Sequence, residues 1–171
     1  MKPFRVRQAT VKDAQSIQAV LIKSQWFTYE KLFSKDYIQN LIERYYNIER
    51  IKREIKSIDS IWHGYIIAEE NGKVIGVIGG GMVDETVGEV YVLYLEPTMR
   101  GRGVGTRLLN FFTKIQKHKY GAIEQWVAVA KGNHYGIPFY EARGFIFQHE
   151  EQSYGSTNQD HDISLKYKRT I

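Results

Sequence analysis

The 171-residue sequence predicts an α/β (α+β) fold in which a mixed, mostly antiparallel seven-stranded sheet is flanked by helices. Three observations lead to this prediction. Seven segments are short and rich in β-branched and aromatic residues, as strands are. Asn71-Gly72 joins two of these segments and is a strong signal for a tight antiparallel hairpin. Strand 89–95 is followed by a helix and then strand 124–130, and such a crossover makes the two strands parallel.

The first third of the chain is predicted to be mainly helical. Residues 4–7 alternate in polarity and predict a first strand. Residues 10–13 resemble a capping box, which opens a helix. Residues 24–32 lose the helical period and are interpreted as a loop rich in aromatic side chains. Ser34 and Asn47 are expected to cap two further helices, with isoleucine at helical spacing in each.

From residue 62 the period of the apolar residues changes from helical to alternating. Strands are predicted over residues 62–70, 73–84 and 89–95. The run Gly79–Gly81 interrupts the second of them, which suggests a bulge or the close approach of another backbone or a ligand.

The last third of the chain is predicted to alternate between helix and strand. Pro138 fits only the first turn of a helix, which begins near Gly136 and ends at Gly144. Two final strands follow over residues 145–152 and 161–168.

Composition excludes several classes of protein. The chain has no cysteine, so a disulfide framework, a thiolate metal site and a cysteine nucleophile are excluded. The five histidines lack ligand spacing, and no metal is expected. The net charge of +5 is modest and scattered; it favours an anionic ligand but does not by itself indicate nucleic acid. The most apolar segment, 74–83, is shorter than the about 18 residues a membrane span needs. A single domain over residues 1–171, located in the cytoplasm, is the expectation.

The stretch after strand 89–95 has the features of a phosphate-holding turn. Pro97 ends the strand, and a turn rich in arginine and glycine opens a helix. Such a turn presents backbone N–H groups and the positive end of a helix to an anion. The residues involved are Arg100, Gly101, Arg102, Gly103, Val104, Gly105 and Thr106. The spacing matches neither the dinucleotide fingerprint nor the P-loop.

Three short motifs follow one another along the second half of the chain. They are Arg100-x-x-Gly103-x-Gly105, then Asn133 and Tyr140 seven residues apart, then Gly144-Phe145. Together they resemble the GNAT family of acetyl-CoA-dependent N-acetyltransferases. The predicted order of helices and strands resembles that fold along essentially the whole chain.

This resemblance implies a role for particular residues in binding acetyl-CoA. The end of the fourth strand, Leu93, Tyr94 and Leu95, would pair with the pantetheine arm like an added strand. The amides of Arg102 to Thr106 would hold the pyrophosphate, and Asn133 would contact the cofactor. Two catalytic roles also follow: Tyr140 would protonate the departing thiolate, and Glu89 would deprotonate the amine through water.

The chemistry itself requires the same groups. An amine must lose a proton before or during attack on a thioester, which needs a carboxylate or a water chain leading to one. The tetrahedral intermediate needs a backbone N–H, expected here near Tyr94 or Leu95. Glu96 is a rival base, although it lies at the cofactor end of the strand. Each assignment also has a structural alternative: Tyr140 as core, Glu89 as a solvated charge, and Asn133 as a helix cap.

The acceptor amine is less well defined. Trp26 and Tyr29, with the charged helical segment after them, are loosely similar to PaiA-type polyamine acetyltransferases. Both aromatic residues have an alternative role in packing the helices onto the sheet. A polycationic acceptor would need local acids, for which the candidates are Glu30, Asp84, Glu85 and Glu89, followed by Glu150 and Glu151.

The sequence therefore predicts transfer of acetyl from acetyl-CoA to a small primary amine, with spermidine or spermine favoured, by direct attack in a ternary complex. An acetyltransferase of protein α-amines or lysines is the alternative within the same class. A CoA-binding regulatory module without turnover is the alternative from another class. No nucleic acid or membrane partner is expected, and monomer and homodimer both remain open.

Overall fold

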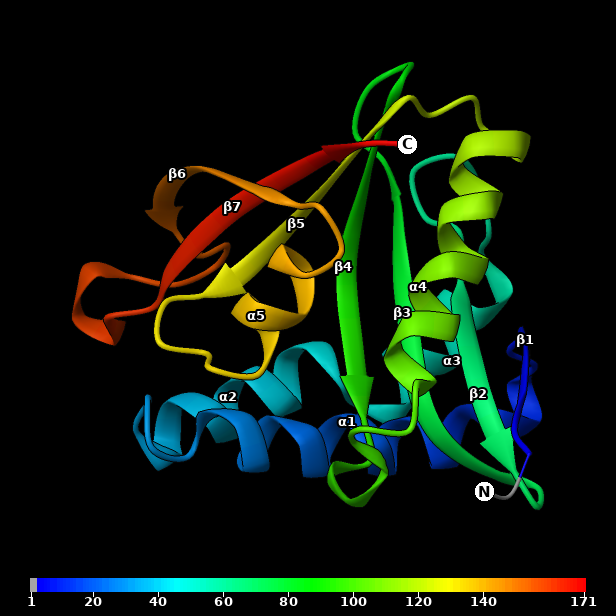
Figure 1. Cartoon of the computed structure of the whole chain (residues 1–171). Helices are drawn as coiled ribbons and strands as arrows, with labels where there is room; N and C mark the ends of the chain where they lie inside the picture. The colour runs from blue at the N-terminus through cyan, green and yellow to red at the C-terminus, as the bar shows by residue number, and fades with distance from the viewer. Residues whose placement is uncertain (1–2) are drawn as a thin grey trace.

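The computed structural model describes residues 3–171 and contains one seven-stranded sheet in the order β1-β2-β3-β4-β5-β7-β6 (Figure 1). All neighbouring strands are antiparallel except β4 and β5, which are parallel as predicted. The strands are β1 (Arg5–Gln8), β2 (Tyr65–Glu70), β3 (Lys73–Met82), β4 (Val87–Leu95), β5 (Glu124–Ala130), β6 (Ile146–Gln152) and β7 (Ile163–Thr170). The predicted fold class is confirmed.

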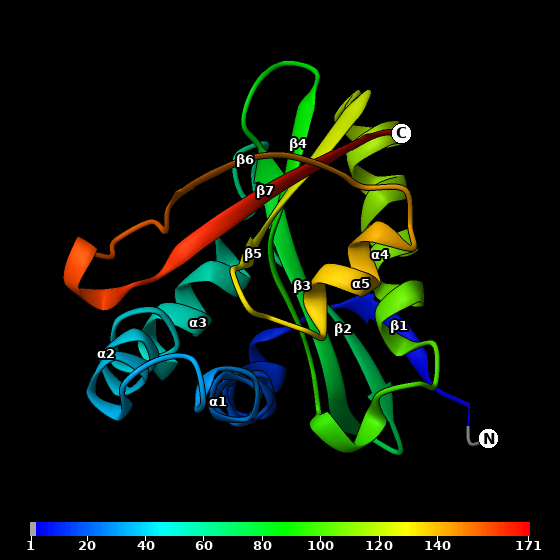
Figure 2. The same ribbon diagram turned by 60° about the vertical axis from the view of Figure 1, so that its left-hand side comes forward.

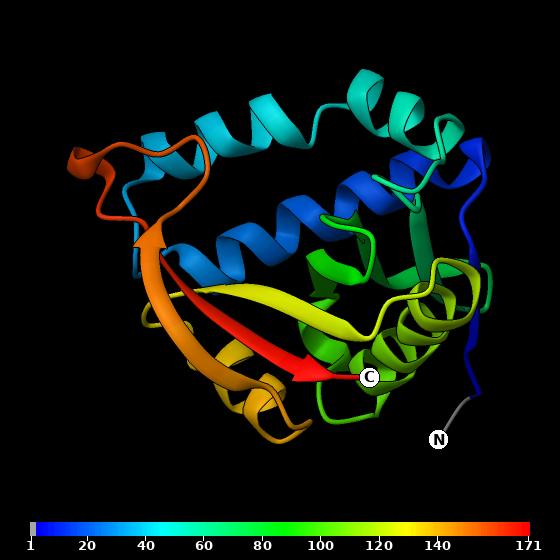
Figure 3. The same cartoon turned by 90° about the horizontal axis from the view of Figure 1, so that it is seen from above.

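The helices cover the two faces of this sheet. Helices α1, α2 and α3 lie on one face, and α4 and α5 lie on the other, as Figures 2 and 3 show from two sides. Apolar side chains fill both interfaces, because each helix turns an apolar stripe toward the sheet. The helices are α1 (Ala14–Tyr29), α2 (Lys35–Tyr45), α3 (Ile48–Lys56), α4 (Val104–Lys114) and α5 (Gly136–Glu141).

The prediction of a loop over residues 24–32 is wrong, since α1 continues to Tyr29. The error has a physical cause. Two of the residues on the buried face of these last turns are polar: Ser24 and Gln25 are almost completely buried. Ser24 Oγ donates a hydrogen bond of 2.6 Å to the carbonyl of Leu95 in β4. Burial of hydrogen-bonded polar groups removes the apolar period without removing the helix.

The predicted helix caps are present. Ser34 Oγ accepts from the amide of Tyr37 at 3.1 Å, and Asn47 Oδ1 accepts from the amide of Arg50 at 2.9 Å. The capping box at Thr10 opens a three-residue 3-10 turn that continues into α1. Ser34 and Asn47 each satisfy an amide that the first turn of a helix leaves unpaired, and at the capping box Asp13 accepts from the amide of Thr10.

The strand predicted from Trp62 begins only at Tyr65. The preceding residues turn about Asp59, whose Oδ1 accepts from the amides of Ile61 and Trp62 at 2.9 and 2.8 Å. The next strand is also shorter than predicted and ends at Met82 instead of Asp84.

The glycine run in β3 has two of the three features that the sequence suggested as alternatives, a bulge and the close approach of another backbone. Another backbone approaches closely, because a Cβ at Gly81 would lie 1.7 Å from the carbonyl oxygen of Ile61. The register with β4 also shifts between Gly79 and Gly80. Gly79 pairs with Val92 and Gly80 with Val90, so the extra residue of this bulge is Tyr91 on β4.

This bulge marks the point where β4 and β5 separate. The two strands pair only from Val87↔Glu124 to Val90↔Val127. Beyond Val90, the edge of β4 that faces β5 has no strand partner, and Figure 1 shows the two strands diverging. The fold therefore leaves an opening in the middle of the sheet, next to unpaired strand backbone.

Candidate active site

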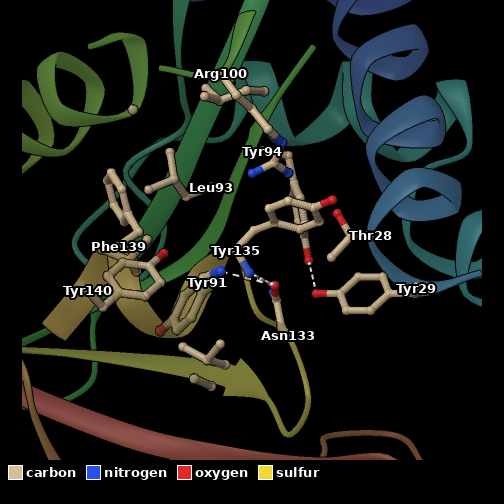
Figure 4. A pocket seen from close by; sticks show the side chains of 16 residues that line it. Thr28, Tyr29, Tyr91, Leu93, Tyr94, Arg100, Asn133, Tyr135, Phe139 and Tyr140 are labelled. Atoms are coloured by element: carbon tan, nitrogen blue, oxygen red, sulfur yellow. Dashed lines mark hydrogen bonds between the residues drawn. The ribbon is translucent and has the colours of Figure 1, made fainter. Parts of the chain in front are cut away.

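A pocket occupies the opening between β4 and β5 (Figure 4). Leu93, Tyr94 and Leu95 line it from β4, while Asn133 and Tyr140 line it from the loop and the helix α5 that follow β5. The fold thus brings together two groups of residues that lie about forty positions apart in the sequence, at the place where the resemblance predicted them. Arg100 also lines the pocket from the turn that follows β4, and Gly105 lines it from the first turn of α4.

The turn after β4 has the backbone geometry of an anion site. Gly101 and Gly103 adopt φ values of 79° and 80°, in the left-handed region that favours glycine. Gly103 is the N-cap of α4, so the free amides of the first helical turn follow it directly. At Gly105 a Cβ would lie 3.1 Å from the Phe139 ring, so glycine allows α4 and α5 to pack closely at the pocket.

Tyr140 sits in the pocket wall with 8% of its surface exposed. The rings of Phe139 and Phe145 pack edge-on against it, at 5.2 and 5.3 Å. Burial raises the pKa of the Tyr140 phenol, and the nearby Tyr94 raises it further. The phenol therefore carries its proton at neutral pH and has one to donate.

Asn133 caps a helix, which was the alternative to a role at the cofactor, and it also lines the pocket. Its Oδ1 accepts from the amides of Tyr135 and Gly136 at 3.0 and 2.9 Å, which caps the start of α5. The same side chain lines the pocket (Figure 4).

Tyr29 and Tyr94 join α1 to β4 in the pocket wall. Their hydroxyls are 2.8 Å apart and hydrogen-bonded, as the dashed line in Figure 4 shows. Burial raises the pKa of both phenols. Tyr29, predicted to contact the amine, lies in the pocket lining with its hydroxyl directed at Tyr94.

The two arginines of the turn have different environments. Arg100 lies over the ring of Tyr135 at 4.0 Å, lines the pocket, and has a buried Nε without a hydrogen-bond partner. Burial lowers its pKa. The Arg102 guanidinium instead forms an ion pair with Glu70 of β2 and contacts Met99 Sδ. The side chain of Arg102 is thus engaged away from the pocket lining.

Arg143 was not predicted as a site residue, yet it stands at the first turn of α4. Its guanidinium donates to Thr106 Oγ1 at 2.5 and 3.2 Å and to the carbonyl of Phe139 at 2.7 Å. It also covers the Phe139 ring at 3.7 Å. Within residues 3–171, no carboxylate lies within ion-pair distance of it. Only its place in the segment from Tyr140 to Gly144 signalled it in the sequence.

Glu89 points to the opposite face of the sheet from α4. Its neighbour Gly88 faces Gln116, and successive strand residues alternate between faces. Glu89 forms an ion pair with Lys166 of β7, and both side chains are about 85% buried, being 15% and 14% exposed. Lys166 Nζ also lies 3.7 Å from Glu151.

A second ion pair lies beside the first. Lys168 Nζ is 3.7 Å from Glu124, and both flank the indole of Trp126, which is the strand partner of Glu89. We call these charged residues the ion-pair cluster: Glu89, Glu124, Glu151, Lys166 and Lys168.

The other acids predicted for the site lie elsewhere. Glu96, the rival base, is 6% exposed and paired with Lys23 at 2.6 Å at the far end of β4. Asp84 and Glu85 are exposed in the turn between β3 and β4, and Glu30 is exposed at the end of α1. None of these four acids lines the pocket. Trp26 is half-buried against Tyr29, Ile38 and Ile42, which fits its alternative role in packing.

Comparison with known proteins identifies the family. The family model described as "Acetyltransferase (GNAT) family" matches residues 26–145. The chain belongs to the GNAT acetyltransferases. It is 28% identical over 146 residues to spermidine N(1)-acetyltransferase of Thermoplasma acidophilum, covering 83% of this chain and 88% of the relative. An uncharacterized N-acetyltransferase of Methanocaldococcus jannaschii is 33% identical over 89 residues, 48% of this chain and 38% of the other.

Solved structures of GNAT proteins have the same fold. The PaiA N-acetyltransferase of Thermoplasma acidophilum, solved in complex with coenzyme A, superposes with a TM-score of 0.80 at 26% identity. The match covers 98% of this chain and 99% of that one. Ard1 of Thermoplasma volcanium shares the fold with a TM-score of 0.70 at 19% identity, covering 98% and 97%.

Membership in the GNAT family makes the chain an acyltransferase, as predicted. GNAT enzymes use acetyl-CoA, so the predicted cofactor is confirmed for the family. The pocket fits that cofactor on three counts: an unpaired strand edge, a left-handed glycine turn, and the amino end of α4. In the described part of the chain, no helix is long and apolar enough to cross a bilayer, and no three potential ligand side chains gather for a metal ion.

Proposed function

We propose that this chain, as one domain over residues 1–171, transfers acetyl from acetyl-CoA to a primary amine of a polyamine, spermidine or spermine, in the cytoplasm. The observation that carries the proposal is the pocket between β4 and β5. It has a protonated tyrosine in its wall and unpaired strand backbone along its side. Acetyl and amine meet in a ternary complex without a covalent enzyme intermediate.

The cofactor is held mostly by backbone. The free edge of Leu93, Tyr94 and Leu95 pairs with the pantetheine arm as an added strand. The amides of Arg102 to Thr106, at the start of α4, hold the pyrophosphate. Arg143 supplies the charge beside them, since the Arg102 side chain is engaged by Glu70. When bound, acetyl-CoA supplies an activated thioester carbonyl.

The protons are moved by two side chains on opposite sides of the opening. Tyr140 donates the proton that the departing thiolate needs, and its burial keeps that proton in place until then. Glu89 accepts the proton of the amine, through water, from the far face of the sheet. An amide of Tyr94 or Leu95 stabilises the oxyanion, because the β4 edge toward β5 has no strand partner there.

Two observations support a polyamine as the acceptor. The relative that matches 83% of the chain is a spermidine N(1)-acetyltransferase. In addition, Val90 of the pocket lining directly follows Glu89 of the ion-pair cluster, in which Glu124 accepts a hydrogen bond from the indole of Trp126. Carboxylates and an indole face are the groups that attract ammonium ions.

The direct test measures release of free CoA from acetyl-CoA with separate amines. The panel contains spermidine, spermine, single amino acids, and peptides with a free α-amine or a lysine. We expect release with the two polyamines and none with the peptides. The Tyr140→Phe variant serves as the matched control for enzymatic turnover.

Two outcomes contradict the proposal. Release with peptides alone would make the chain a protein acetyltransferase. Retained CoA binding without release for any amine would make it a CoA-binding regulatory module. Size-exclusion chromatography with light scattering decides between monomer and homodimer in the same preparation.

A further inference from the structure

One lysine of the chain stands where the proposed reaction needs an acceptor amine. Lys166 lies on β7, and its Nζ is ion-paired with Glu89, the proposed base. Its side chain is 14% exposed, whereas those of Lys168 and Lys131 are 39% and 60% exposed. The amine most closely associated with the base is thus one that bulk solvent barely reaches.

The pocket extends to the strand position next to this lysine. Ala128 of β5 lines the pocket and is exposed, and its strand partner on β7 is Lys166. Val90 and Tyr91, the residues that follow Glu89 on β4, line the same pocket. Paired strand residues lie about 5 Å apart, and a lysine stem is long and flexible. Lys166 is therefore the strand neighbour of a pocket-lining residue, and its ammonium is held by the residue that precedes Val90 on β4.

The charged groups around Lys166 come from four strands, β4 to β7. Glu89 on β4 and Glu151 on β6 are its carboxylate neighbours, and Lys168 follows on the same strand with Glu124 as its own partner. In the ion-pair cluster, three carboxylates face two lysines. Lys166 has thereby the surroundings expected of an incoming ammonium: a base in contact and a second carboxylate close by.

We propose that Lys166 is a site of self-acetylation, which rests on the acetyl-CoA-dependent activity proposed above. Glu89 takes a proton from the Lys166 ammonium. The freed electron pair of Nζ forms a bond to the acetyl carbon while the carbon–sulfur bond breaks. The leaving thiolate takes the proton of Tyr140, and the second proton of the amine passes to water.

The product is a neutral amide, so the modification changes the charge of the ion-pair cluster. Glu89 and Glu151 lose their shared cation. The face that leads to the pocket becomes more acidic and better suited to a polycation.

The test incubates the full-length protein with acetyl-CoA and without any amine. Intact mass and peptide mapping then follow the acetyl group at each lysine over time. We expect one acetyl group per chain, at Lys166, gained about 10- to 100-fold faster than at Lys168. Lys168 is the matched control because it lies on the same strand, is ion-paired to a glutamate, and is more exposed. Chemical acetylation by the thioester alone would favour the more exposed lysine.

Two variants identify the route. Tyr140→Phe is expected to slow acetylation of Lys166 and to leave the slow chemical acetylation of Lys168 unchanged. Lys166→Arg is expected to remove the added acetyl group from the intact mass, because a guanidinium does not accept it. Acetylation of Lys166 no faster than of Lys168, or at a rate that Tyr140→Phe leaves unchanged, would overturn the proposal.

Turnover of spermidine in the same preparation separates this inference from the proposed function. Release of CoA with spermidine while Lys166 stays unmodified refutes self-acetylation alone. Acetylation of Lys166 without turnover of any added amine supports self-acetylation and refutes the polyamine proposal. Neither reaction, in a protein that binds CoA, refutes both.

Discussion

The two sides of strand β4 are built by different means. On the side of α4 and α5, the groups proposed to hold the cofactor are mainly backbone: a free strand edge, two left-handed glycines and the start of a helix. On the opposite side, the ion-pair cluster is made of side chains from four strands, β4 to β7. Each lysine of the cluster has a carboxylate partner from another strand.

The two sides should therefore respond differently to substitution. A site built from backbone tolerates most substitutions outside its glycines, because its donors do not depend on side-chain type. A site built from ion pairs changes its ligand with a single substitution. In the proposed function, binding of the cofactor therefore depends mainly on the fold, whereas the choice of the acceptor amine would depend on a few side chains on the other face.

The largest expected effect is on turnover, and it tests the α4 and α5 side of the strand, where the cofactor is proposed to bind. Tyr140→Phe removes the phenol and keeps the ring between Phe139 and Phe145, so we expect turnover to fall about 100-fold. The dissociation constant for CoA, measured by calorimetry, should stay within about twofold. Tyr154→Phe is the control, since Tyr154 is 91% exposed. Unchanged turnover would remove Tyr140 from the acid role.

The next effect tests the opposite side. Glu89→Gln is expected to lower turnover about 10- to 100-fold near neutral pH and to leave CoA affinity unchanged. The substitution also leaves Lys166 with Glu151 as its remaining carboxylate partner. The pH–rate profile separates a base from a structural role: the variant should lose the acidic limb of the profile. A profile of the same shape at lower amplitude would assign Glu89 a structural role only.

A smaller effect compares two arginines at the cofactor. Arg143→Gln is expected to raise the dissociation constant for CoA about tenfold, because it removes the unpaired charge beside the start of α4. Arg102→Gln should leave that constant nearly unchanged and lower the melting temperature, since Arg102 is paired with Glu70. If Arg102→Gln instead weakened CoA binding and Arg143→Gln did not, Arg102 would be the side chain that contacts the pyrophosphate.

The smallest expected effect is on the pH dependence of stability, and it concerns His63, which lies near the end of α4. His63 stacks on Tyr120 at 4.0 Å, just past α4, and its Nε2 is buried without a partner. Burial lowers the pKa of His63 below its ordinary value of 6.5, so the unfolded chain binds the proton first. Its contribution to stability is therefore complete above pH 6.5 and is lost as the pH falls below that value.

His63→Phe keeps an aromatic ring in this position and removes the titration. We expect the melting temperature of the variant to fall less than that of the original protein between about pH 7 and pH 5. Thermal unfolding followed by circular dichroism at several pH values measures the difference. Equal slopes for the two proteins would show that His63 does not contribute to the pH dependence of stability.

Most of the fold followed from local patterns. The hairpin at Asn71-Gly72, the caps at Ser34 and Asn47, and the parallel pair around α4 depend on neighbouring residues and were all predicted. The missed part of α1 depended on Ser24, whose hydroxyl bonds to a strand seventy-one residues away. No local pattern contains that partner.

The sequence by itself determined the glycine-rich turn before α4, where the cofactor is proposed to bind. Glycine at fixed spacing allows only a few backbone conformations, so the turn before α4 could be recognised from its residues alone. Tertiary structure alone decided the partners of the charged side chains: Glu89 with Lys166, Arg102 with Glu70, and Arg143 with Thr106. The reason is physical, because backbone geometry is a local property, whereas an ion pair exists only once distant segments have folded together.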